Sequence, residues 1–299
     1  MISIAITAFK EPKTIKKAIE SLLDQDLKEK YEIVVSAPDE ETLSVARQYA
    51  NEHKNVSVFK DPGKGKMLAL HMLFEKLKGN ILVFTDGDVH VKPNSLKYLL
   101  EPFKDPKVGC VSGRPMSLNS KRTMLGYWSH LLCDAGAHGA RLKRFRKGQF
   151  LECSGYLWAF RNSVVKKFPM DLPEDSTVPL LFREKGYKIA YAPKAIVYVK
   201  YPTNFHDFID QKKRTTKAHV QTGNYVNVKK IPKTKSFKNE ALESYRAFFY
   251  PRNFMEVIWT LLLFPAKLYV YLLVYYQVKV VKKYHKDGWK ATKSTKTLS

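Results

Sequence analysis

The chain has 299 residues, 44% hydrophobic and 13% aromatic, which is enough apolar material for a folded core and excludes a disordered tail. Its 52 lysines and arginines outnumber 28 acidic residues and leave a formal net charge of +24. This excess predicts an anionic partner, whether a nucleic acid, anionic lipid headgroups or a phosphorylated substrate. The three cysteines form no CxxC pair, which favours a reducing cytosolic compartment over a disulfide framework or a zinc site.

Strand-like and helix-like runs alternate over the first 112 residues. The strand-like runs are 2–7, 31–36, 55–59, 80–85 and 107–112. Between them, apolar residues recur at helical spacing over 15–23, 43–50 and 67–77. Because the first strand begins at residue 2, we expect no cleaved signal peptide. The alternation predicts an α/β domain with a mainly parallel sheet covered on both faces, in which ligands bind at the carboxyl ends of the strands.

The regular alternation of strand-like and helix-like runs ends in the second half of the chain. Segment 118–150 is mixed and contains five basic residues within 141–147, and strand-like runs return at 187–192 and 195–200. A basic linker over 229–252 leads to the apolar stretch 257–278, whose 22 residues would be about 33 Å long as a helix. This length is sufficient to cross a bilayer core of about 30 Å.

Two residues in the apolar stretch argue against a simple transmembrane span. Pro265 would kink a helix, and Lys267 would place a charge near the centre of the membrane. Two interfacial or hairpin helices are therefore expected at least as strongly as one transmembrane helix. The tyrosines near the end of the stretch and the lysines that follow suit the headgroup region, so we predict membrane association through 253–281. A buried core hairpin or a dimer interface is the alternative.

An acidic pair follows the fourth strand-like run. Asp86 and Asp88 are two residues apart, so in an extended chain both carboxylates can reach one cation, and oxygen-only ligation favours Mg²⁺ or Mn²⁺. Gly87 between them permits a close backbone approach. The loop before the preceding helix contains Lys64 and Lys66 with two glycines, which can cradle an anion. In isolation, these segments could also be an acidic turn and a solvated basic loop.

These segments and four others resemble the inverting, GT-A-fold glycosyltransferases of family 2, in motifs ordered along most of residues 1–220. The opening strand and helix match at "SIAITAFKEPKTIKKAIESLLDQ" (3–25), the segment before the metal-binding strand at "GKGKMLAL" (63–70), and the Asp-X-Asp strand at "ILVFTDGDVHVKPNSL" (81–96). The acceptor-side segment resembles "SGYLWAFRNSVV" (154–165), and the Glu-Asp segment resembles "LPEDSTVPLLFREKGYKIAYAP" (172–193). Finally, "QKKRT" (211–215) resembles the Gln-X-X-Arg-Trp motif of the membrane-linked members.

By matching position, the resemblance implies a donor side and an acceptor side. Asp86 and Asp88 would hold the divalent cation with the donor's ribose and diphosphate, Asp88 being the more direct ligand. Asp175 would be the general base that deprotonates an acceptor hydroxyl. The implied nucleotide-sugar-binding residues are Thr7, Ala8, Glu11, Asp39, Lys64, Lys66, Asp86, Gly87 and Asp88. On the acceptor and diphosphate side they are Gly155, Tyr156, Glu174, Gln211 and Arg214.

The chain departs from the family pattern at three positions. Ser36 stands where many members carry an acidic residue after the second strand, which shifts the expected nucleobase contact to Asp39 or elsewhere. Lys10 replaces a common asparagine. Thr215 replaces the tryptophan of the last motif, so we expect transfer of a single sugar and not processive polymer synthesis.

The resemblance implies a GT-A (Rossmann-like) α/β fold, with a mainly parallel mixed sheet flanked by helices and a C-terminal hydrophobic helical region that associates with a membrane. We expect a catalytic domain over 1–228, with a nucleotide-binding half (1–112) and an acceptor-side half (113–228), then the linker (229–252) and a hydrophobic region with a basic tail (253–299).

The expected activity is a metal-dependent hexosyl transfer in glycan biosynthesis, from a nucleotide-diphosphate sugar to a hydroxyl of a lipid-linked saccharide or similar acceptor. It would occur at the cytoplasmic face of an anionic membrane. One alternative is a polyprenyl-phosphate glycosyltransferase of the dolichyl-phosphate-sugar synthase type, whose anionic acceptor needs no base. From another class, +24 would also suit a nucleic-acid-binding protein, although the sequence contains no recognised nucleic-acid motif.

Overall fold

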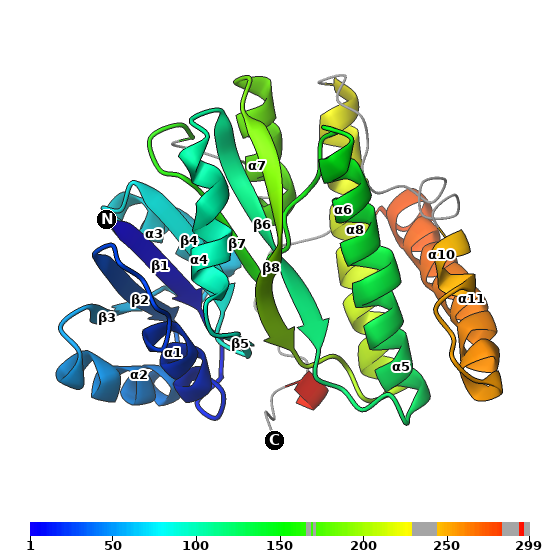
Figure 1. Ribbon diagram of the computed structural model, residues 1–299. Coiled ribbons are helices and arrows are strands. Elements are labelled where there is room, and N and C mark those ends of the chain that lie inside the picture. Colours follow the sequence, from blue (N-terminus) through cyan, green and yellow to red (C-terminus); the bar gives the residue numbers. More distant parts are fainter. Residues whose placement is uncertain (166–168, 170–171, 229–243, 283–292, 296–299) are drawn as a thin grey trace.

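The computed structural model describes residues 1–165, 169, 172–228, 244–282 and 293–295, and its centre is one mixed eight-stranded sheet with helices on both faces (Figure 1). The strand order is β3-β2-β1-β4-β7-β6-β8-β5. The predicted linker falls largely outside the described residues, as does most of the basic tail.

The first half of the sheet is parallel, as the sequence predicts. Strand β1 (Ile2–Thr7) lies between β2 (Tyr31–Ala37) and β4 (Ile81–Asp86), and β3 (Val56–Lys60) pairs with the outer edge of β2. The connecting helices are α1 (Ile15–Leu23), α2 (Glu40–Glu52) and α3 (Lys66–Lys76). The register pairs Thr7 with Asp86, so the ends of β1 and β4 meet at the same edge.

The second half makes the sheet mixed. Strand β7 (Leu157–Arg161) runs antiparallel to both β4 and β6 (Val108–Ser117), and β8 (Lys188–Val199) is parallel to β6. The short strand β5 (Val89–Val91) pairs antiparallel with the end of β8. Helices α4 (Ser95–Leu100) and α7 (Glu174–Glu184) connect these strands, and a 3₁₀ turn, Glu101–Lys104, follows α4.

Two hydrophobic clusters cover the two faces of the sheet. On one face, Ile4 and Ile6 of β1 belong to the cluster that includes residues of α1, α2 and α4. On the other, Ala5 of β1 belongs to the cluster that includes residues of α3 and α7. The second cluster includes a stack of aromatic rings in which Phe160 lies 5.0–5.4 Å from Phe74, Phe84 and Trp158 between ring centroids. The period-2 alternation of β1 therefore places consecutive side chains in different halves of the core.

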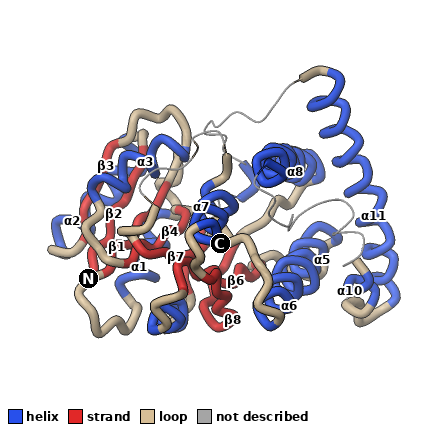
Figure 2. Tube along the Cα trace, turned by 90° about the horizontal axis from the view of Figure 1, so that it is seen from above, coloured by secondary structure: helices blue, strands red, loops and turns tan. Residues whose placement is uncertain are grey.

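A layer of long helices lies beside the sheet. It consists of α5 (Met124–Leu131), a π-helical turn (Leu132–His138), α6 (Gly139–Arg146) and α8 (Phe205–Val228). Outside this layer lie α10 (Tyr245–Phe248) and α11 (Phe254–Tyr275), at the end of the molecule opposite β1, β2 and β3 in both views (Figures 1 and 2). A π-helical turn, Tyr276–Val280, extends α11.

The expected pair of short helices over 257–278 is wrong, because the chain forms the single helix α11 through Pro265. One stripe of α11 is buried against the rest of the protein, through Leu263, Ala266, Val270 and Val274. At its start, the Trp128 indole N–H donates to the Trp259 carbonyl oxygen (2.6 Å), and the hydroxyls of Tyr127 and Thr260 lie 2.7 Å apart. This packing along the whole helix offsets the cost of about 3 kcal/mol for an internal proline.

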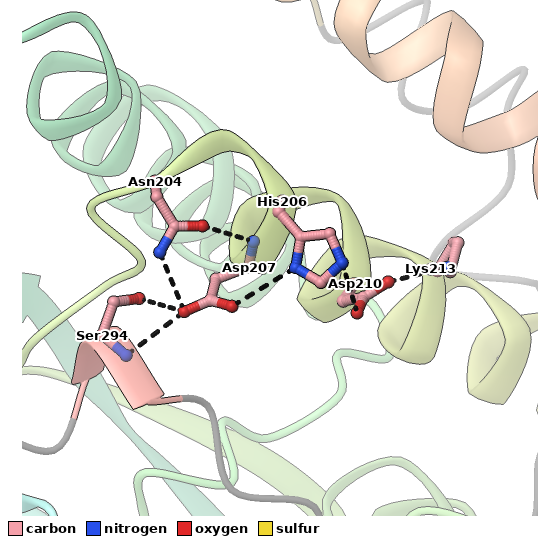
Figure 3. A network of polar contacts seen from close by, with 6 residues as sticks. All are labelled: Asn204, His206, Asp207, Asp210, Lys213 and Ser294. Atoms are coloured by element: carbon pink, nitrogen blue, oxygen red, sulfur yellow. Dashed lines mark hydrogen bonds and ion pairs between the residues drawn. The ribbon is translucent and has the colours of Figure 1, made fainter.

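The C-terminal 3₁₀ turn, Lys293–Thr295, is attached to the start of α8 (Figure 3). Ser294 donates to Asp207 Oδ2 from its hydroxyl (2.5 Å) and from its backbone N–H (3.2 Å), and Asn204 Nδ2 donates to the same oxygen (3.1 Å). These hydrogen bonds lower the pKa of Asp207.

Candidate active site

The predicted donor-side residues of β1 and β4 come together at the ends of these strands. The Thr7 hydroxyl donates to Asp86 Oδ1 (3.3 Å), and the Gly87 N–H donates to the Thr7 carbonyl oxygen (2.9 Å). A Cβ atom at Gly87 would lie 2.6 Å from Glu11 Oε2 and 2.7 Å from Ala8 Cβ. Glycine is therefore required here because the loop after β1 touches the turn between the two aspartates.

Lys66 links this edge to the first turn of α7. Its ammonium lies 2.7 Å from Asp86 Oδ1 and 2.9 Å from Glu174 Oε1, and the Lys66 side chain is 25% exposed. Burial alone would lower the pKa of Lys66, but the charges of Asp86 and Glu174 and the hydrogen bonds to them raise it well above its ordinary value. Lys64, in the same loop, is exposed to solvent.

Asp175, the predicted general base, is next to Glu174 in α7. Its Oδ2 accepts a hydrogen bond from the Gly155 N–H (3.0 Å), and its carbonyl oxygen accepts one from the Cys153 N–H (3.0 Å). The start of a helix also favours a carboxylate, because the helix dipole is positive there. The loop before β7 thus fixes the side-chain orientation of Asp175.

Tyr156 connects the acidic pair with α8. Burial raises the pKa of Tyr156, the charges of Asp88 and Asp86 raise it further, and the charge of Arg214 opposes them. The Tyr156 carbonyl oxygen accepts a hydrogen bond from the Thr85 hydroxyl (2.7 Å), which ties the acceptor-side segment to β4. The charges of both predicted aspartates and of the predicted diphosphate-contacting arginine therefore act on this half-buried tyrosine.

Gln211, the other predicted residue of α8, lines a small pocket between α5 and α8. The lining also includes Tyr201 and Phe208. The Tyr201 ring packs edge-on against Tyr156, with 6.1 Å between the centroids. The pocket that Gln211 lines is thus bordered by Tyr201, which in turn contacts Tyr156.

Asp39, a predicted nucleotide-sugar-binding residue, lies at the start of α2. It caps α2: Oδ1 accepts hydrogen bonds from the Thr42 N–H (3.0 Å) and hydroxyl (2.6 Å), and Oδ2 accepts one from the Lys10 N–H (2.7 Å). Burial acts to raise its pKa, but these hydrogen bonds lower it overall. Lys10 itself has a φ of +54°, a left-handed conformation that asparagine adopts more readily than lysine. This backbone conformation explains why asparagine suits the position.

Sequence reasoning missed Asp61, which follows the end of β3. The side chain is 3% exposed, and its Oδ2 accepts a hydrogen bond from the Ser36 hydroxyl (3.0 Å) at the end of β2. Burial raises its pKa. The available signal was the position, because an acidic residue directly after a strand lies at the ligand-binding edge of a parallel sheet.

The acidic pair fits a divalent cation that also binds substrate phosphates. Among the described residues, no group of three or more His, Cys, Asp or Glu side chains could hold a metal by itself. Mg²⁺ is commonly bound by only one or two carboxylates, completed by phosphate oxygens and water. The Asp86 carboxylate, at the end of β4, is one of these candidate ligands, and it already contacts the ammonium of Lys66.

Comparisons with known proteins agree with this geometry. An N-acetylglucosaminyltransferase of Azorhizobium caulinodans is 22% identical over 240 residues (73% of this chain and 59% of that protein), and a hyaluronan synthase of Streptococcus pyogenes is 23% identical over 250 residues (77% and 59%). The chain thus spans less than two thirds of either relative. A mannosyltransferase from Pyrobaculum calidifontis, solved with GDP-Man and Mn²⁺, shares the fold (TM-score 0.61, 18% identity, 94% of this chain and 80% of that one). The profile of the glycosyltransferase like family 2 matches residues 1–218, and the chain therefore belongs to this family of glycosyltransferases.

Proposed function

We propose that the protein transfers a single sugar, with inversion, from a nucleotide-diphosphate sugar to the hydroxyl of an acceptor held near a membrane surface. The observation that carries this proposal is the bridge from Asp86 through Lys66 to Glu174, which joins the predicted donor side to the residue that directly precedes the predicted base Asp175. The relative named as an N-acetylglucosaminyltransferase and the structural neighbour solved with GDP-Man support a nucleotide-sugar donor.

On the donor side, Asp86 and Asp88 would hold Mg²⁺ or Mn²⁺, which when bound neutralises negative charge on the diphosphate leaving group. Thr7, Ala8 and Glu11 line the loop after β1 and would contact the nucleoside. Asp61 is a second candidate for nucleobase contact beside Asp39, because it is a buried carboxyl group at the same strand edge. Arg214 suits a bidentate contact with the diphosphate, and Gln211 would support the same region.

On the acceptor side, Asp175 accepts the proton of the attacking hydroxyl. The Gly155 N–H holds Oδ2, so the carboxylate is oriented before the acceptor arrives. A general base contributes roughly 10²–10⁴-fold to such a reaction. Tyr156 would form the wall between donor and acceptor, since the charges of both aspartates and of Arg214 act on it.

A donor screen tests this function. Release of nucleoside diphosphate from UDP-, GDP- and TDP-sugars would be measured with Mn²⁺ and with EDTA, beginning with UDP-N-acetylglucosamine and GDP-mannose. We expect turnover of one donor that EDTA abolishes and that Asp88→Ala reduces at least about 100-fold, as loss of a principal electrostatic contact would. Absence of metal-dependent turnover with every donor, and an Asp88→Ala variant that behaves identically, would refute the enzymatic proposal.

Helix α11 supports attachment of the protein to a membrane surface. The most apolar 18-residue window within Phe254–Val280 has a mean hydropathy of 1.9, yet only 28% of it is buried, unlike the core helix of a soluble protein. While one stripe packs on the protein, the opposite face exposes large apolar side chains: Val257, Leu261, Leu262, Leu268, Tyr269, Leu272, Tyr275 and Tyr276. Because the packed stripe runs along the whole helix, we propose that α11 lies in the membrane interface and does not cross the bilayer.

Vesicle binding tests this attachment. We expect the protein to float with vesicles that contain anionic lipid, and Leu261→Gln with Leu272→Gln to weaken this binding at least about tenfold, since each leucine buries apolar area in the interface. Leu118→Gln, at a comparably exposed leucine outside α10 and α11, is the control (41% exposed, against 53% and 59%). Equal vesicle binding by the double variant and the control would contradict the attachment through α11.

A further inference from the structure

Lys66 makes two ion pairs with carboxylates that belong to opposite sides of the site. Its ammonium is 2.7 Å from Asp86 at the end of β4 and 2.9 Å from Glu174 in the first turn of α7. All three side chains are largely buried, with exposed fractions of 25%, 22% and 10%. Such a pair of contacts is screened less by solvent than a surface ion pair.

This arrangement conflicts with a divalent cation on Asp86. A Mg²⁺ or Mn²⁺ ligand oxygen lies about 2.1 Å from the metal, so a cation on Asp86 Oδ1 would be within a few ångströms of the ammonium that already contacts this oxygen. The two positive charges repel each other at low effective dielectric constant. The cation can bind Asp86 favourably only if Lys66 moves away or if additional negative charge enters with the cation.

A nucleoside diphosphate supplies this negative charge. Its phosphate oxygens can ligate the cation and also accept hydrogen bonds from the ammonium, while Glu174 keeps its ion pair with Lys66. On these grounds we propose that Lys66 is a positioning residue that makes cation binding depend on the nucleotide. The Lys66 ammonium contacts Asp86 when the site is empty. When the cation and the nucleotide bind together, the ammonium leaves Asp86 and contacts the diphosphate. This inference rests on the proposed nucleotide-sugar site.

A consequence for the acceptor side follows from the second ion pair. When Lys66 leaves Asp86, Glu174 becomes its only carboxylate partner among the contacts described above, and Glu174 directly precedes Asp175 in α7. Binding of the donor thereby changes the ion-pair partners of Lys66 next to the helix that carries the proposed base. The link needs no movement of the sheet, since only the lysine side chain changes its partner.

Binding of Mn²⁺ tests the proposal without any sugar transfer. Free Mn²⁺ would be measured by electron paramagnetic resonance with the wild-type protein alone, and again with GDP or with UDP at saturation. We expect one of the nucleotides to tighten Mn²⁺ binding at least about tenfold, a coupling of ordinary size for two linked ligands. A wild-type protein that binds Mn²⁺ equally well with and without both nucleotides, or that binds no Mn²⁺ at all, overturns the proposal before any variant is made.

The variant Lys66→Met then separates this role from a merely structural one. Methionine is similar in length and uncharged, so we expect Mn²⁺ alone to bind about tenfold more tightly than to the wild type, and the nucleotide to bind the Mn²⁺-loaded protein more weakly. Lys54→Met, which removes an exposed lysine between α2 and β3, should leave the Mn²⁺ affinity of the nucleotide-free protein within about twofold.

The proposal predicts opposite changes in Lys66→Met, namely tighter binding of Mn²⁺ alone and weaker binding of the nucleotide. Weaker binding of both Mn²⁺ alone and nucleotide by Lys66→Met, or an unchanged Mn²⁺ affinity, overturns it. The outcome is separable from that of the donor screen: if the predicted exchange occurs without turnover of any nucleotide sugar, the role of Lys66 stands and the proposed transfer reaction fails. If a nucleotide sugar is turned over but the predicted exchange does not occur, the proposed transfer reaction stands and the role of Lys66 fails.

Discussion

Replacing Asp175 by asparagine removes the proposed general base and keeps the hydrogen bond that positions it. The amide oxygen of asparagine can still accept from the Gly155 N–H, which lies 3.0 Å from Asp175 Oδ2. The loss of charge weakens this bond, and we expect a decrease of about 1 kcal/mol in the free energy of unfolding, or roughly 2–4 °C in melting temperature. The variant should therefore be folded and able to bind donor.

The catalytic effect of Asp175→Asn should be much larger than its effect on stability. Loss of a general base predicts a decrease in kcat of roughly 10²–10⁴-fold, which corresponds to about 3–5.5 kcal/mol in the barrier. The KM for the nucleotide sugar should change by less than about threefold, because the donor is held by other residues. Nucleoside diphosphate release at varied donor concentration measures both constants, and Asp105→Asn, at an exposed acid in the turn before β6, is the matched control.

A mild loss of activity in Asp175→Asn would refute this reasoning. An acceptor that is already an anionic phosphate needs no base, so near-normal turnover would favour a polyprenyl-phosphate acceptor over a hydroxyl. A large loss of stability together with activity would instead show that the charge of Asp175 is needed for folding.

Three further predictions concern the fold. Phe160→Ala should lower the free energy of unfolding by about 3–5 kcal/mol in urea denaturation, because the ring is fully buried in the aromatic stack, whereas Phe145→Ala, at a 41% exposed ring, should change it by less than about 1 kcal/mol. Trp128→Phe removes the hydrogen bond to α11 and should cost about 1–2 kcal/mol by the same measurement; no change would contradict the docking of α11. Asp207→Asn should lower the free energy of unfolding by about 1 kcal/mol at pH 7, because the lowered pKa of Asp207 means that the ionised carboxylate stabilises the fold above pH 4. This difference from the wild type should disappear as the pH falls below the pKa of Asp207 in the folded protein. A difference that does not depend on pH would exclude the charge as its cause.

The fold of the first half could be predicted because each strand is a short apolar run and each helix has a clear apolar face. The second half shows where local patterns are insufficient. The runs 187–192 and 195–200 form one strand, β8, although Pro193 lies between them. The register with β6 jumps from Tyr191 to Ile196, so the proline lies in a bulge where no ladder hydrogen bond is lost. A register shift depends on the partner strand and cannot be read from either run alone.

Pro265 shows that local sequence patterns are also insufficient to predict where a helix ends. The sequence predicts an interruption there, yet α11 is continuous because its buried stripe packs against the neighbouring helices. Local propensity is a weak guide when tertiary contacts are this extensive.

In the candidate site, motif order predicts which residues gather, and strand ends explain why. Thr7, Asp86 and Gly87 meet because β1 and β4 are parallel neighbours. The bridge made by Lys66 could not be predicted, because it joins the first residue of α3 to the first turn of α7, and only the folded chain places these segments side by side. The capping role of Asp39 could not be predicted for a related reason, since the sequence does not show that its carboxylate accepts a hydrogen bond from the Thr42 N–H at the start of α2.

Metal-dependent donor binding tests the central claim most directly. Isothermal titration of the preferred nucleotide sugar into the wild-type protein, with Mn²⁺ and with EDTA, should show an affinity at least about tenfold higher with the metal, and Asp88→Asn with Mn²⁺ should bind as weakly as the wild type in EDTA. Asp105→Asn should bind as the wild type does in both conditions. If the donor binds equally well in EDTA, or if Asp88→Asn retains the metal-dependent gain, the acidic pair at the end of β4 is not the clamp for the cation and the diphosphate.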